Sequence, residues 1–142
     1  MDRSGDKAFA SWCVMTHARP ALVSALRAWG LGAAASAIEQ ATSLGSLKIA
    51  AAEADSLVRR RIVFTPLRRD LSNAATTLQA AVTFATRADS QNAAAMVIGV
   101  FTNAASALSW RQPWTRFTWR CRRAEIIATA LREQDDYRQT QT

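Results

Sequence analysis

The residues best suited to chemistry are two groups of arginine. The first group flanks a Thr65-Pro66 pair and consists of Arg59, Arg60, Arg61, Arg68 and Arg69. A guanidinium group is permanently charged and binds phosphate or carboxylate through two parallel hydrogen bonds. If the helices that meet at Thr65-Pro66 pack antiparallel, all five arginines gather at one end of the molecule, where they could hold phosphates. The alternative is a solvated helix end at which Asp55 and Asp70 partly neutralise the arginines.

The second group lies in residues 109–123, which read SWRQPWTRFTWRCRR. Arg116, Arg120 and Arg123 are spaced four and three residues apart, so a helix would carry them on one side. Trp119 borders that side. Tryptophan interleaved with arginine suits stacking on unpaired nucleic-acid bases, and it equally suits a lipid headgroup layer. In the alternative interpretation, Trp114 and Phe117 belong to the core, whereas Trp119 lies off their stripe.

A catalytic or metal site is not predicted. Cys13 and His17 are four residues apart and would share a helical face, as half of a metal site or as a nucleophile pair. Cys121 is the only other cysteine, His17 is the only histidine, and no carboxylate stands at ligand spacing beside the pair. The sequence also lacks the common phosphate-loop, dinucleotide and zinc-protease motifs. We therefore expect no catalytic residue, no metal and no cofactor.

Charge is distributed unevenly along the 142 residues. Residues 1–58 carry five basic and five acidic side chains, so the whole net charge of +7 lies in residues 59–142. No acidic residue stands between Asp89 and Glu125. Such asymmetry indicates a polyanionic partner. The alternative is a soluble basic domain whose arginines pair with acidic residues of neighbouring helices.

The pattern of apolar residues predicts helices throughout, and one domain over residues 1–142. Alanine is abundant, and no stretch alternates apolar and polar residues for long. We expect an all-α fold, an antiparallel bundle of four long helices plus an N-terminal helix. Residues 1–32 form an N-terminal helical arm and residues 33–138 the bundle. The expected helices cover about residues 6–17, 20–29, 33–64, 65–87, 90–109 and a last one from Pro113.

Individual residues predict the faces and ends of these helices. Gly30 breaks the chain, Thr65 caps a helix that opens with Pro66, and Asp89 or Ser90 caps the next one. The first of these helices should bury Leu67, Leu71, Ala75, Leu78, Val82 and Ala85. The second should bury Ala94, Val97, Phe101, Ala104 and Leu108.

A membrane segment is the main alternative for one stretch. Residues 93–110 contain no charge over 18 residues, which barely reaches the length of a span, and several polar residues interrupt them. Tryptophans and arginines follow, as at a membrane interface. The mean hydropathy of the chain, −0.07, favours a soluble core helix instead.

The second half of the chain resembles a known family. A basic run at 59–61, the segment VIGVFTNAASAL at 97–108, and then Trp110, Trp114, Phe117 and Glu125 occur in this order. The arrangement is similar to the bacterial SLATT group over residues 55–137. Members of that group are two-span membrane proteins thought to be effectors of bacterial defence systems, so the resemblance implies a membrane hairpin. Arg68, Arg69 and Asp70 depart from it, because they stand near the start of the first hairpin helix.

The sequence thus predicts a non-enzymatic helical adaptor or assembly subunit that docks through an Arg/Trp-rich surface. The expected partner is nucleic acid or an acidic face of another protein subunit. The alternative is a membrane-associated helical protein, such as a SLATT-like effector, with residues 93–110 in or on an anionic bilayer. Cysteine usage predicts a reducing intracellular compartment, in the cytoplasm or at a membrane. The absence of acidic residues from positions 7–38 leaves a mitochondrial address open.

Overall fold

A computed structural model describes residues 4–111 of the chain. Every regular element in that range is a helix, which confirms the predicted all-α class. The elements are α1 (Ser4–Cys13), the π-helix η1 (Val14–Ala18), α2 (Arg19–Ala28), α3 (Gly32–Glu39), α4 (Leu44–Arg61), α5 (Thr65–Thr86) and α6 (Ser90–Ser109). The helix predicted from Pro113 lies outside the described residues.

The first three elements form one continuous rod, although the sequence predicted a new helix at Pro20. A proline inside a helix lacks the backbone N–H, and its ring collides with the carbonyl group four residues earlier. Here the preceding turn is η1, a π-helix in which the backbone N–H of Arg19 bonds to the carbonyl of Val14. This wider turn accommodates Pro20, so the rod continues where the sequence indicated a break.

The rod ends at Gly30, as predicted. Gly30 has φ +78°, a left-handed conformation that glycine adopts without steric cost. The N–H of Leu31 donates to the carbonyl of Leu26 at 2.9 Å, and the N–H of Gly30 donates to the carbonyl of Arg27 at 3.2 Å. These two bonds make a Schellman motif, which ends α2. The chain then reverses direction and forms α3 alongside α2.

The single helix predicted over residues 33–64 is wrong, because the chain breaks at residues 40–43 into α3 and α4. Ser43 begins α4 through a capping box with Ser46, in which each side chain bonds to the other residue's backbone N–H at 3.1 Å. Arg19, on the rod, donates to the carbonyl of Ala41 at 2.8 Å. A serine pair and a distant arginine therefore stabilise a break that apolar periodicity does not reveal.

α5 buries the whole predicted stripe, and α6 buries only part of the one predicted for it. All six predicted residues of α5 are buried. In α6, Val97 and Ala104 are buried as predicted. Ala94, Phe101 and Leu108 are only half-buried, and their neighbours Ala93, Val100 and Ala107 are buried instead. α6 lies close to α5 at Gly99, where a Cβ atom would lie 2.9 Å from Cγ2 of Thr77.

The turn between α5 and α6 has the same geometry as the turn at Gly30. The N–H of Asp89 donates to the carbonyl of Phe84 at 3.0 Å, and Ala88 takes the left-handed position with φ 60°. Asp89 then caps α6, as predicted, and accepts hydrogen bonds from Asn92. Those bonds from the Asn92 side chain and backbone N–H lower the pKa of the Asp89 carboxyl group below its ordinary value of 3.8.

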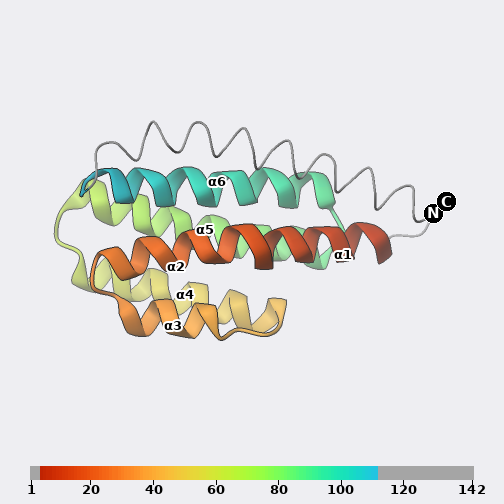
Figure 1. Ribbon diagram of the computed structural model, residues 1–142, viewed down its shortest axis with the longest axis horizontal. Helices are drawn as coiled ribbons and strands as arrows, with labels where there is room; N and C mark the ends of the chain where they lie inside the picture. The colour runs from red at the N-terminus through yellow and green to blue at the C-terminus, as the bar shows by residue number, and fades with distance from the viewer. Residues whose placement is uncertain (1–3, 112–142) are drawn as a thin grey trace.

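The helices surround one core. The α1–α2 rod lies along α5 and α6, while α3 and α4 lie together on the other side (Figure 1). The packing of α5 against α6 is the most extensive contact between elements, and α4 also packs on α5. The largest fully buried side chains include Leu22, Leu26, Ile38, Leu71 and Leu78. The ends of α2, α4 and α6 and the start of α5 therefore lie at one end of the molecule (Figure 1).

Candidate functional site

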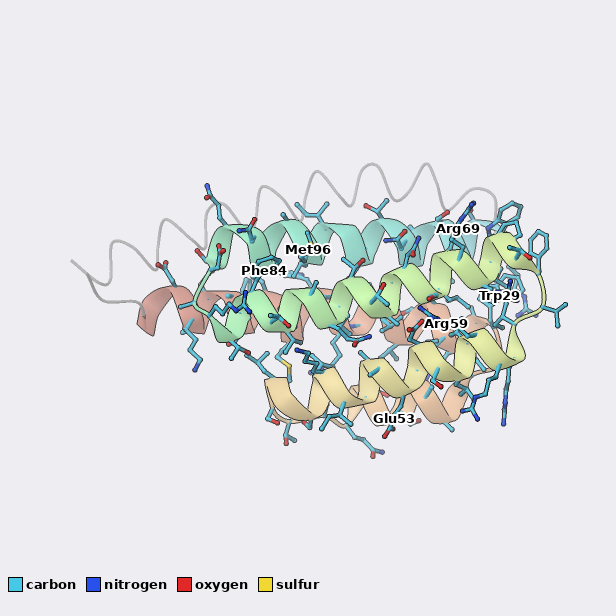
Figure 2. The ribbon with its side chains drawn as sticks, turned by 180° about the vertical axis from the view of Figure 1, so that it is seen from behind. Trp29, Glu53, Arg59, Arg69, Phe84 and Met96 are labelled. Carbon is cyan, nitrogen blue, oxygen red and sulfur yellow. The ribbon has the colours of Figure 1, made fainter. Side chains whose placement is uncertain are left out.

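The short connection between α4 and α5 brings the first group of arginines together. Arg59, Arg60 and Arg61 form the last turn of α4, and Arg68 and Arg69 follow in the first turns of α5. Figure 2 shows Arg59, Arg69 and Trp29 at the same end of the molecule, near this connection. We call the five arginines together with Arg111, at the end of α6, the basic end.

Most arginines of the α4–α5 connection have no acidic partner among the described residues. Arg59 pairs with Asp55 at 3.3 Å, one helical turn away. Arg60 donates to the carbonyl of Ser56 at 3.4 Å. The structure records no ion pair of Arg60, Arg61, Arg68 or Arg69 within residues 4–111, and all but Arg68 are exposed. Their charges are therefore available to an external anion.

Asp70 does not neutralise these arginines, although it stands next to Arg69. Its Oδ2 atom accepts a hydrogen bond from the Ser106 hydroxyl at 2.9 Å and another from the Trp110 indole N–H at 3.0 Å. Both donors belong to the end of α6. The carboxylate thus fastens α6 to α5, and of the two acids expected to compensate the basic end, only Asp55 pairs with an arginine.

Three large apolar side chains are exposed between the arginines. Val63 is 87% exposed, Phe64 51% and Trp110 44%. The rings of Phe64 and Trp110 meet edge to face, with their centroids 5.1 Å apart. We call these three residues the apolar tip. The tip was not among the predicted site residues, although three apolar residues, Ile62, Val63 and Phe64, stand between the basic run and Pro66.

Trp29, at the end of the rod, connects the rod to α6 through a hydrogen bond. The indole N–H of Trp29 donates to the carbonyl of Ala107 at 3.1 Å. The guanidinium carbon of Arg111 lies 5.5 Å from the centre of the Trp29 ring, and the same guanidinium donates to the carbonyl of Ala28. Arg111 therefore both orders the basic end and adds a charge to it.

The remaining predicted residues are not brought into this site. Arg116, Trp119, Arg120 and Arg123 lie outside the described residues. Cys13 is buried in α1, and the ring of His17 meets that of Trp12 edge to face at 5.1 Å. Within residues 4–111 no three side chains of histidine, cysteine, aspartate or glutamate gather as a metal site would require.

One described helix, α6, is long and apolar enough to cross a membrane, by length and composition alone. It packs against α5, α2 and α1 through its small side chains, as a core helix of a bundle does. Of the most apolar 18-residue window of α6, 39% is buried inside the protein.

Comparison with known proteins gives no match. No protein-family model, no curated protein and no solved structure is significantly similar to this chain. The resemblance to the SLATT group therefore stays a prediction, and the function must be inferred from the surface itself.

Proposed function

We propose that this protein is a non-enzymatic docking module that binds a polyanionic surface through its basic end. The observation that carries the proposal is the set of three exposed arginines without an acidic partner in the described residues, Arg60, Arg61 and Arg69, around one short connection. Guanidinium groups concentrated in this way attract phosphates and raise association rates. The absence of catalytic motifs from the sequence agrees with a binding role.

The proposal includes two predictions made from the sequence: the complete four-helix bundle and the second group of arginines. The bundle would be completed by the antiparallel helix expected from Pro113, which makes four long helices plus the N-terminal arm. Arg116, Trp119, Arg120 and Arg123 would then extend the same surface, because their segment directly follows Arg111. Docking of a core bundle is favoured over insertion of residues 93–110 into a bilayer, since α6 buries its face against α5.

The test measures retention on immobilised heparin, a generic polyanion, at increasing salt. The test variant changes Arg60, Arg61 and Arg69 to Glu. A control variant changes Lys7, Lys48 and Arg87, which are exposed and lie away from the basic end, to Glu. Each replacement removes two units of charge, so both variants carry a net charge of +1 instead of +7.

We expect the basic-end variant to elute at much lower salt than the control variant, with a salt dependence smaller by about two to three counterions. Equal losses in both variants would mean that net charge alone causes binding, and would overturn the proposal. Failure of the unmodified protein to bind would also overturn it. A third variant, with Arg116, Arg120 and Arg123 changed to Glu, tests whether that segment belongs to the same surface.

A further inference from the structure

We propose that the polyanion is an anionic lipid surface, and that the apolar tip enters its headgroup layer while the arginines bind the lipid phosphates. This inference rests on the proposed function and names its partner. It uses the α4–α5 connection together with Trp110 as the part that touches the membrane, and it does not insert the whole of residues 93–110. The protein would therefore attach as a folded bundle, with α6 remaining in the core.

Val63 gives the first argument for lipid. It is the most exposed large apolar residue of the described chain, at 87%. An aliphatic side chain has no ring to stack on a nucleic-acid base and no hydrogen-bonding group to offer a protein carboxylate. Its transfer from water into the acyl boundary of a bilayer is favourable, because the removal of apolar surface from water is favourable in any apolar medium.

Phe64 and Trp110 give the second argument. Their edge-to-face contact occupies the edge of one ring and the face of the other, which reduces the ring surface left for base stacking. The Trp110 N–H is already bonded to Asp70. Both residues nevertheless remain about half exposed, at 51% for Phe64 and 44% for Trp110. An amphipathic ring that is held in place beside an exposed aliphatic residue suits a membrane interface.

The position of the charges relative to the tip gives the third argument. Arg60 and Arg61 end α4 just before Val63, and Arg69 stands four residues after Thr65, about 6 Å along α5. A segment that lies at the interface buries its apolar side by about 5–10 Å. When the tip reaches that depth, the guanidinium groups stand at the level of the lipid phosphates, where each basic residue strengthens binding about fivefold.

The experiment measures co-sedimentation of the full chain with vesicles. One set consists of phosphatidylcholine alone, and the other contains about one third phosphatidylserine to provide the negative surface. We expect binding only to the second set. Val63→Ser and Phe64→Ser should each weaken it about fivefold to thirtyfold. Changing Arg60, Arg61 and Arg69 to Glu should weaken it at least about a hundredfold.

Ile49→Ser is the matched control, because Ile49 is 63% exposed on α4 but stands twelve residues before Arg61, about 18 Å along the helix. It should bind vesicles like the unmodified protein. Equal weakening by Ile49→Ser and Val63→Ser would overturn the assignment of the tip. Circular dichroism verifies the fold of each variant, and Val63, which is nearly free of contacts, provides a readout even if Phe64→Ser loosens Trp110.

A labelled single-stranded DNA oligonucleotide serves as the second probe, with binding followed by fluorescence anisotropy. Binding to DNA but not to anionic vesicles, with dependence on the arginines and none on Val63, would overturn the lipid inference and leave the proposed function standing. Binding to neither vesicles nor DNA nor heparin would overturn both. The insertion of the tip would be overturned if the arginine variant binds vesicles more weakly while Val63→Ser and Phe64→Ser bind them as strongly as the unmodified protein.

Discussion

At the scale of single residues, two helix ends share one hydrogen-bond pattern but differ in the residue at the left-handed position. Gly30 occupies it after α2 with φ +78°, and Ala88 occupies it after α5 with φ 60°. A left-handed conformation costs a residue with a Cβ atom roughly 1–2 kcal/mol, and costs glycine almost nothing. The same motif is therefore relaxed at one turn and strained at the other.

This difference predicts opposite effects of exchanging the two residues. Gly30→Ala should lower the free energy of unfolding by about 1 kcal/mol, because nothing within 4 Å opposes the new Cβ atom and only the backbone is strained. Ala88→Gly should raise it by about 0.5–1 kcal/mol, since the relief of strain exceeds the added flexibility of the unfolded chain. Urea denaturation measures both, and a change of the same sign in the two variants would contradict this account.

At the scale of elements, the start of a helix depends on which side chain accepts a hydrogen bond from the backbone N–H groups of its first turn. The Thr65-Pro66 pair suggested Thr65 as the cap of α5. That prediction is wrong, because α5 already includes Thr65, and the capping position belongs to Phe64, whose side chain makes no capping bond. The fixed backbone angle of Pro66 starts this helix instead. Ser43, at the start of α4, is a true side-chain cap.

The two candidate caps therefore predict different stabilities after replacement by alanine. Ser43→Ala should lower the free energy of unfolding by about 1 kcal/mol, because the capping box with Ser46 is lost. Thr65→Ala should change it by less than about 0.5 kcal/mol, as is usual for an exposed residue without a special contact. Thermal and urea unfolding compare the pair directly. A larger loss in Thr65→Ala than in Ser43→Ala would show that the helix starts were assigned incorrectly.

At the scale of the whole molecule, a few polar contacts fix how the helices meet at the basic end. Asp70 of α5 accepts hydrogen bonds from Ser106 and Trp110 at the end of α6. Trp29 of the rod donates a hydrogen bond to the backbone of α6, and Phe64 packs on Trp110. These contacts join segments that are 36 to 78 residues apart in the chain. They join the end of the rod, the start of α5 and the end of α6 beside the α4–α5 connection.

Asp70→Ala tests this linkage. Both hydrogen bonds to a charged acceptor are lost, so the free energy of unfolding should fall by about 1–3 kcal/mol. Glu53→Ala is the control, because this substitution removes the same charge and Glu53 is exposed on the outer face of α4 (Figure 2). It should leave stability nearly unchanged. An equal, small effect of both substitutions in urea denaturation would indicate that Asp70 contributes nothing to the junction of α5 and α6.

The sequence alone determined the features that depend on neighbouring residues. Apolar spacing identified the helices and the buried stripe of α5, and Gly30 and Asp89 marked helix ends, because periodicity and capping act within a few residues. Only the tertiary structure decided the features that depend on distant contacts. The rod continues through the π turn before Pro20, the Ala41 carbonyl in the break of the predicted long helix accepts a bond from the distant Arg19, and α6 lies close to α5 at Gly99.

The candidate site shows the same division. The basic run and the turn at Pro66 were sufficient to predict that Arg59–Arg61 and Arg68–Arg69 gather at one end. The sequence could not show which of these arginines have no acidic partner, because that depends on Asp70. Its carboxylate accepts hydrogen bonds from Ser106 and Trp110, at the end of α6, and does not pair with an arginine among the described residues. The apolar tip likewise exists only because α6 ends beside the α4–α5 connection, where Trp110 meets Phe64. No local pattern encodes such a meeting, since it is set by the packing of whole helices.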